Sequence, residues 1–63
     1  MKHAHNPEHL RILIVDDHAL FRVGMRQILE QEADMEVVGE AIDGRSAEEA
    51  AQALLPDVIL LDL

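Results

Sequence analysis

Two short apolar runs, each followed by acidic residues, constrain the fold of this chain most strongly. Residues 58–61, Val-Ile-Leu-Leu, form an unbroken apolar run, and Asp62 follows it directly. Residues 11–15, Arg-Ile-Leu-Ile-Val, form a second run, which Asp16 and Asp17 follow. Unbroken apolar runs of this length are typical of parallel strands that are covered on both faces. If the two strands lie side by side, three carboxylates meet at one rim of a sheet.

The segment after the first strand has the periodicity of an amphipathic helix. Over residues 19–31, apolar side chains recur at spacings of three and four, which predicts a helix with one apolar face. That face consists of Leu20, Phe21, Gly24, Met25, Ile28 and Leu29. Glycine inside a helix costs up to ~1 kcal/mol relative to alanine, so we expect Gly24 to allow close packing on the sheet. Asp16 or Asp17 is expected to accept hydrogen bonds from the first helical turn.

The middle of the chain predicts a second strand and a second helix. Residues 35–41, Met-Glu-Val-Val-Gly-Glu-Ala, alternate imperfectly, and two glutamates in a strand suit the edge of a sheet. Asp43 and the glycine after it signal a turn. Residues 45–54 predict a helix with a stripe of small apolar side chains, and Ser46 followed by Glu49 matches a capping box at its start.

The predicted elements follow one another as β-α-β-α-β, which defines an α/β fold. Right-handed crossovers place the helices on opposite faces if the second and third strands flank the first. The parallel strand order is then 2-1-3, the beginning of a flavodoxin-like sheet. In such sheets ligands bind at the topological switch point, here the gap between the carboxyl ends of the first and third strands.

The charge of the chain limits its direct partners. Thirteen acidic residues against five Lys and Arg give a formal net charge of −8, which argues against direct nucleic-acid binding by these 63 residues. The same charge suits a metal cation, a basic partner or simple solubility. No apolar run approaches the length of a membrane span. Residues 1–9 lack the apolar segment of a signal peptide, and we expect a disordered leader whose histidines bind metals only adventitiously.

Four motifs, in this order along the chain, closely resemble a response-regulator receiver domain of the NarL/FixJ type. They are Ile-Leu-Ile-Val-Asp-Asp-His at 12–18, Phe-Arg-Val-Gly-Met at 21–25, Asp-Gly at 43–44 and Pro-Asp-Val-Ile-Leu-Leu-Asp-Leu at 56–63. The resemblance covers residues 10–63. It implies a flavodoxin-like half-domain, the N-terminal half of a receiver truncated after the third strand.

The resemblance implies a role for each of the three carboxylates. Asp62 matches the phosphoacceptor, Asp17 matches the acid that coordinates a divalent cation directly, and Asp16 matches a neighbour that acts through water. The implied cofactor is Mg²⁺, which binds a few carboxylates together with waters and phosphate oxygens. A carboxylate can attack phosphorus and hold the phosphoryl group as a mixed anhydride. Crowding of three acids also predicts that at least one resists ionising when no metal is bound.

The implied partner is a sensor histidine kinase, and the implied setting is cytoplasmic signalling that regulates transcription. By the resemblance, DNA is bound only through a C-terminal domain that these 63 residues do not contain, and no membrane partner is expected. The segment is expected to be a phosphoacceptor and not an enzyme. Phosphotransfer and autodephosphorylation are expected to need the second half of a receiver.

Two other interpretations are compatible with parts of the pattern. In the first, the chain is a self-associating half-domain without phosphotransfer, and a homodimer forms through the free edge of strand 58–61. Incomplete cover of the sheet should then expose part of Ile12, Ile14, Ile59 or Leu61. In the second, the chain is a generic nucleotide-binding βαβ unit, but it lacks the Gly-x-Gly-x-x-Gly and Gly-x-x-x-x-Gly-Lys signatures after its first strand.

Overall fold

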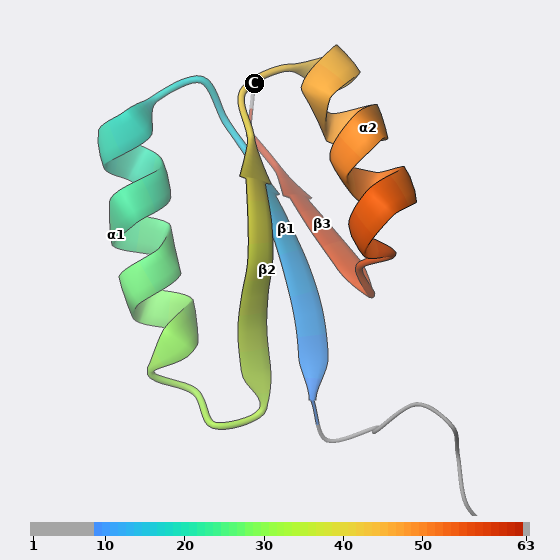
Figure 1. Ribbon diagram of the computed structural model, residues 1–63. Helices are drawn as coiled ribbons and strands as arrows, with labels where there is room; N and C mark the ends of the chain where they lie inside the picture. The colour runs from blue at the N-terminus through green and yellow to red at the C-terminus, as the bar shows by residue number, and fades with distance from the viewer. Residues whose placement is uncertain (1–8, 63) are drawn as a thin grey trace, which may run out of the picture.

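The computed structural model describes residues 9–62, so the predicted leader lies outside the described residues except for His9. Three parallel strands form one sheet in the order β2-β1-β3, and two helices cover its opposite faces (Figure 1). The elements are β1 (Leu10–Val15), α1 (Ala19–Glu30), β2 (Met35–Ala41), α2 (Gly44–Leu54) and β3 (Val58–Leu61). The predicted α/β class and the strand order 2-1-3 are confirmed. Among the described residues, neither helix is long and apolar enough to cross a membrane.

The central strand β1 supplies both apolar cores, because successive side chains of a strand point to opposite faces of the sheet. Ile12 and Ile14 face α1 and pack with Val37 of β2. Leu13 and Val15 face α2. The side chains packed against them are Ala41 of β2 and Ala47, Ala50, Ala51 and Leu54 of α2. These four β1 side chains are buried, so the exposure predicted for Ile12, Ile14, Ile59 or Leu61 does not fall on Ile12 or Ile14.

The pairing of β1 with β2 contains an irregularity that fits a glycine. Ile12 lies opposite Val37, whereas Leu13 lies opposite Gly39, so Val38 is an extra residue in β2. A Cβ atom on Gly39 would lie 2.5 Å from Leu54 Cδ1. The missing side chain therefore lets α2 pack closely on β2.

Helix α2 is bounded by a capping box and by a left-handed residue. Asp43 Oδ1 accepts the N–H of Ser46 at 2.8 Å, and Ser46 Oγ accepts the N–H of Asp43 at 3.2 Å. The predicted box of Ser46 and Glu49 is therefore wrong, because Asp43 caps the helix one turn earlier. At the other end, Leu55 has φ 51°. Pro56 disfavours the right-handed helical conformation of the residue before it, which ends the helix at this point.

Only part of the predicted apolar face of α1 contacts the sheet. Met25 and Leu29 pack against the core formed around Ile12 and Ile14. Leu20 and Ile28 are largely exposed, at 84% and 61% of their accessible surface. The apolar face of this helix is therefore wider than the surface that β1 and β2 cover.

Gly24 does not serve the close packing that we predicted for it. A Cβ atom at this position would meet nothing within 4 Å. We therefore expect Gly24→Ala to stabilise the 63-residue chain by about 0.5–1 kcal/mol, because alanine has the higher helix propensity. Urea denaturation followed by circular dichroism measures this change. Gly39→Ala is the matched control and should give no such gain, because its methyl group meets Leu54; equal stabilisation by both variants would contradict this account.

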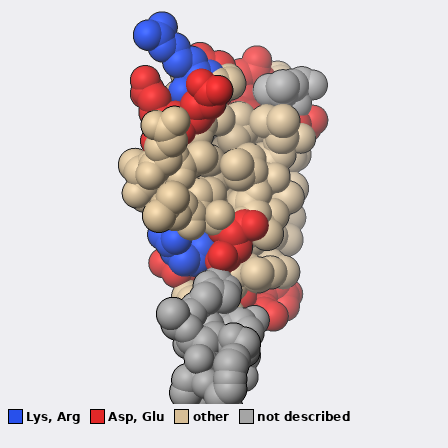
Figure 2. All heavy atoms as spheres, turned by 90° about the vertical axis from the view of Figure 1, so that its right-hand side faces the viewer, with Lys and Arg blue, Asp and Glu red and all other residues tan. Residues whose placement is uncertain are grey.

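The outer side of β3 has no strand beside it among residues 9–62, because β3 pairs only with β1. Ile59 and Leu61 are 47% and 60% exposed, as predicted for an incompletely covered sheet. Figure 2, which views the molecule from the right-hand side of Figure 1, shows a broad uncharged area bordered by charged groups above and below.

Candidate functional site

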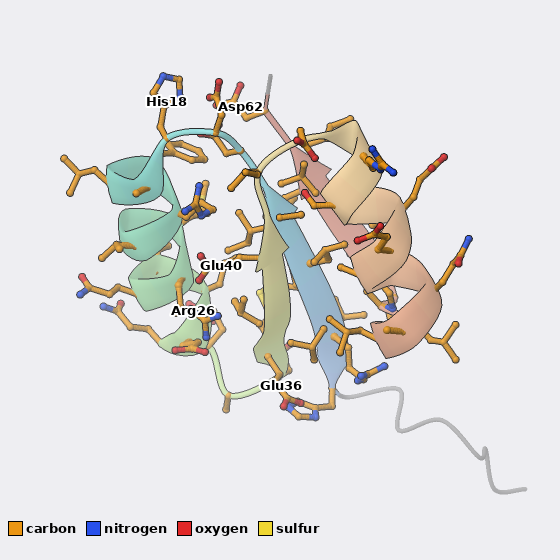
Figure 3. All side chains as sticks on the ribbon, turned by 45° about the horizontal axis from the view of Figure 1, so that its top comes forward. His18, Arg26, Glu36, Glu40 and Asp62 are labelled. Carbon is orange, nitrogen blue, oxygen red and sulfur yellow. The ribbon has the colours of Figure 1, made fainter. Side chains whose placement is uncertain are left out.

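The carboxyl ends of the three strands are tied together by backbone hydrogen bonds. The N–H of Asp62 donates to the carbonyl of Val15 at 3.1 Å, and the N–H of Asp16 donates to the carbonyl of Ala41 at 3.0 Å. Asp62, at the end of β3, and His18, in the loop after β1, therefore lie at the same rim of the sheet (Figure 3). We refer to Asp16, Asp17, His18 and Asp62 as the carboxylate rim.

Asp16 is the most firmly held member of the carboxylate rim. It is only 2% exposed, and its carbonyl accepts a hydrogen bond from Arg22 Nη1 at 2.6 Å. Its carboxylate oxygen Oδ1 accepts the N–H of His18, also at 2.6 Å. His18 is the N-cap residue of α1 and makes no capping bond with its own side chain. The predicted capping of the first helical turn by an aspartate is therefore wrong, since Asp16 bonds the N-cap residue itself.

Hydrogen bonds stabilise the ionised form of Asp16. The backbone N–H of His18 is the main reason that the pKa of this carboxyl lies below its usual value. Burial opposes that effect, and the His18 imidazole and the Asp62 side chain reinforce it. Asp16 is therefore not a carboxyl that resists ionisation, as at least one carboxyl of this rim was predicted to do. A site with this aspartate ionised offers a fixed negative charge to a cation.

His18 bridges the two neighbouring aspartates. Its ring nitrogen Nδ1 lies 3.0 Å from Asp16 Oδ1 and 2.9 Å from Asp17 Oδ1. Asp16 is buried, whereas the side chains of Asp17 and His18 are 70% and 78% exposed. Sequence reasoning placed His18 inside a motif and gave it no role, although its position directly after two aspartates was a signal for a metal-ligating group.

A pair of arginines connects α1 to β2 just below the rim. Arg22 Nε donates to Glu40 Oε1 at 3.0 Å, and Arg26 Nε donates to Glu40 Oε2 at 2.8 Å (Figure 3). The pKa of Glu40 is lowered, mainly by the hydrogen bond from Arg26. Because Arg22 also holds the carbonyl of Asp16, this network fixes the loop that carries the aspartates. The network could not be predicted from the sequence, because charge spacing along α1 does not reveal a partner on β2.

A hollow of about 230 Å³ lies beside Asp62. Its walls are mostly apolar and consist of Phe21, Met25, Leu60, Leu61 and Asp62. The carboxylate of Asp62 is exposed at this hollow, in contrast to the buried carboxylate of Asp16. Of the three predicted site residues, Asp62 is thus open to an incoming reactant, while Asp16 is fixed in place.

The donor groups of the rim fit a divalent cation. Ligand atoms of Asp16, Asp17 and His18 all lie within 4.8 Å of one another. Ligands on opposite sides of an octahedral Mg²⁺ ion are about 4.2 Å apart, so one ion can reach a pair of these atoms after small side-chain rotations. Carboxylates are the ligands that Mg²⁺ prefers in proteins, together with waters.

Comparison with known proteins identifies relatives along nearly the whole chain. The family model described as the response regulator receiver domain matches residues 12–63. The transcriptional regulatory protein LiaR of Bacillus subtilis is 48% identical over 54 residues, which are 86% of this chain and 26% of LiaR. The nitrate/nitrite response regulator protein NarL of Escherichia coli is 47% identical over 58 residues, which are 92% of this chain and 27% of NarL.

A solved structure has the same fold. The signal receiver domain assigned to the response regulator NarL of Mycobacterium tuberculosis superposes with a TM-score of 0.82 at 50% sequence identity. The match covers 89% of this chain and 45% of that domain. This chain spans about a quarter of the length of the two curated relatives.

Proposed function

Because this chain belongs to the response-regulator receiver domain family, we propose that it is the phosphoryl-accepting part of a two-component response regulator. Asp62 is the phosphoacceptor, and Asp17, Asp16 and Asp62 hold Mg²⁺. The observation that carries this proposal is the bond between the Asp62 N–H and the Val15 carbonyl, which fixes Asp62 beside Asp16. A sensor histidine kinase is the proposed phosphoryl donor.

The proposed reaction is the formation of an acyl phosphate on Asp62. A carboxylate oxygen attacks phosphorus, the bond from phosphorus to the donor breaks, and a mixed anhydride results. Asp62 is exposed and can reach a donor, while Asp16 is buried, ionised and fixed by Arg22. When bound, Mg²⁺ neutralises the negative charge of the carboxylates and of the transferring phosphoryl group.

The wider setting is proposed from the relatives. LiaR is named a transcriptional regulatory protein and NarL a response regulator protein, and both are more than three times as long as this chain. We place this segment in a cytoplasmic regulator of transcription that contacts DNA through a C-terminal domain. In that setting the segment is a phosphoacceptor and not itself an enzyme.

The test of this function is Mg²⁺-dependent phosphorylation of a full-length protein that carries this segment. Acetyl phosphate with Mg²⁺ should add about one phosphoryl group per chain, and chelation of the metal should lower the yield of phosphorylated protein several-fold. A gel that separates the phosphorylated form measures the yield. Equal yields with and without Mg²⁺ would contradict the proposed role of the carboxylate rim.

Self-association is a second proposed property, and one specific observation favours it. The outer edge of β3 is not paired among the residues that the structure describes, and Ile59 and Leu61 beside it are about half exposed. A short apolar strand with an open edge is a template for pairing with another chain. We propose a homodimer in which β3 pairs with β3 of a second copy across a twofold axis.

A further inference from the structure

We infer that His18 selects among divalent cations at the carboxylate rim. Its Nδ1 atom joins the ligands of a borderline cation such as Zn²⁺, whereas the same atom must be displaced before Mg²⁺ can bind. The inference rests on the proposed cation site, but it does not depend on phosphoryl transfer to Asp62.

The spacing of the donor atoms suits a shared ion. Two ligands at about 2.1 Å from one ion are about 3.0 Å apart at a right angle and about 3.4 Å apart at the tetrahedral angle. Nδ1 of His18 lies 2.9 Å from Asp17 Oδ1 and 3.0 Å from Asp16 Oδ1. Nδ1 is therefore already about as far from each carboxylate oxygen as one ligand is from its neighbour, and an ion can replace the two hydrogen-bonding contacts after small side-chain adjustments.

The chemistry of the donor atoms separates Zn²⁺ from Mg²⁺. Imidazole nitrogen suits Zn²⁺, Cu²⁺ and Ni²⁺, whereas Mg²⁺ prefers carboxylates, carbonyls and water. For Zn²⁺, the imidazole supplies a third ligand beside the two carboxylates. For Mg²⁺, the imidazole adds no preferred ligand, and it occupies Oδ1 of both aspartates, so an ion that binds these two oxygens must displace both contacts.

The His18 imidazole can both bind an ion and move away from it. The side chain of His18 is 78% exposed, and among residues 9–62 its ring forms polar contacts with the two aspartates alone. The backbone of His18 is held separately, by the bond from its N–H to Asp16 Oδ1. The ring can therefore turn toward solvent without releasing the backbone. Within residues 9–62, this cluster is the only group of three or more potential ligands this close together.

The test compares Zn²⁺ and Mg²⁺ on the 63-residue chain. His3, His5 and His9 are first replaced by glutamine, because they offer Zn²⁺ other ligands. In that background, His18→Asn should lower the ratio of Zn²⁺ affinity to Mg²⁺ affinity by at least tenfold. Removal of a residue that only orients a metal ligand already weakens metal binding by about tenfold or more, so removal of the ligand itself should cost at least as much. Calorimetric titration at constant pH measures both affinities. An unchanged ratio would overturn the inference.

Asp17→Asn is the matched comparison, because it removes a carboxylate that both cations use. It should weaken Zn²⁺ and Mg²⁺ together, whereas His18→Asn should separate them. Circular dichroism of each variant establishes that the fold is retained. Failure of Asp62 to accept a phosphoryl group would leave these affinities unchanged, so the two proposals can fail independently.

A second measurement needs no change at position 18. In the same background His18 is the only histidine, so its imidazole nitrogens give an isolated pair of ¹⁵N resonances. Zn²⁺ should shift the Nδ1 resonance strongly, as direct ligation requires. Mg²⁺ should leave the ring with the resonances of a free side chain. A Zn²⁺ complex in which Nδ1 keeps its metal-free resonance would refute ligation by His18.

Discussion

Replacement of Asp62 by asparagine is expected to abolish phosphorylation of a full-length response regulator that carries this segment. A neutral amide oxygen is a poor nucleophile and cannot form the acyl phosphate, so the loss should be complete within detection. The fold should survive, because Asp62 is held through its backbone N–H and its side chain is exposed. Incorporation of phosphate from acetyl phosphate in the presence of Mg²⁺ measures the effect.

Asp34→Asn is the matched control for this experiment. Asp34 is also an exposed aspartate, but it lies in the turn between α1 and β2 and outside the carboxylate rim. The same chemical change at this position should leave incorporation at the wild-type level. Labelling of Asp62→Asn at the wild-type level would show that another residue accepts the phosphoryl group.

The 63-residue chain is expected to sediment as a dimer, and Leu61→Lys is expected to convert it to a monomer. In the proposed dimer the two β3 strands pair across a twofold axis, so both lysines lie on the paired strands. Two like charges on adjacent strands repel, and a lysine on an edge strand is a common natural device against such pairing. Sedimentation equilibrium in the micromolar range measures the mass of both proteins.

Leu20→Lys controls for the loss of apolar surface alone. Leu20 is 84% exposed and belongs to α1, not to the strand that forms the proposed interface. This variant should remain a dimer. A wild-type chain that is well folded by circular dichroism and sediments as a monomer would exclude the β3 dimer.

The sequence was sufficient to predict the fold because its local signals agree. The two apolar runs, the helical periodicities and the proline at 56 all point to β-α-β-α-β, and the handedness of crossovers leaves one simple strand order. The predictions that proved wrong concern contacts between distant segments of the chain. Gly24 was assigned to packing that does not exist, whereas Gly39 lies against Leu54, fifteen residues further along the chain.

The position of the candidate site could be predicted from the sequence, but the hydrogen bonds within the site could not. Acidic residues after parallel strands must share a rim, so the grouping of the aspartates follows from the strand order. The lowered pKa of Asp16 depends on where the backbone N–H of His18 points, which no residue pattern encodes. Capping by Asp43 instead of Ser46 is a similar case, because both residues are good N-cap residues and the backbone decides between them.

The central claim is that Asp62, at the carboxyl end of β3, is the phosphoacceptor, and chemical mapping of the phosphoryl group tests it most directly. Borohydride reduces an aspartyl phosphate to homoserine, which peptide mass spectrometry locates in the sequence. After phosphorylation of the full-length protein with Mg²⁺ present, we predict homoserine at position 62 and intact aspartate at positions 16 and 17. Homoserine at either of those two positions, with Asp62 unmodified, would contradict the account.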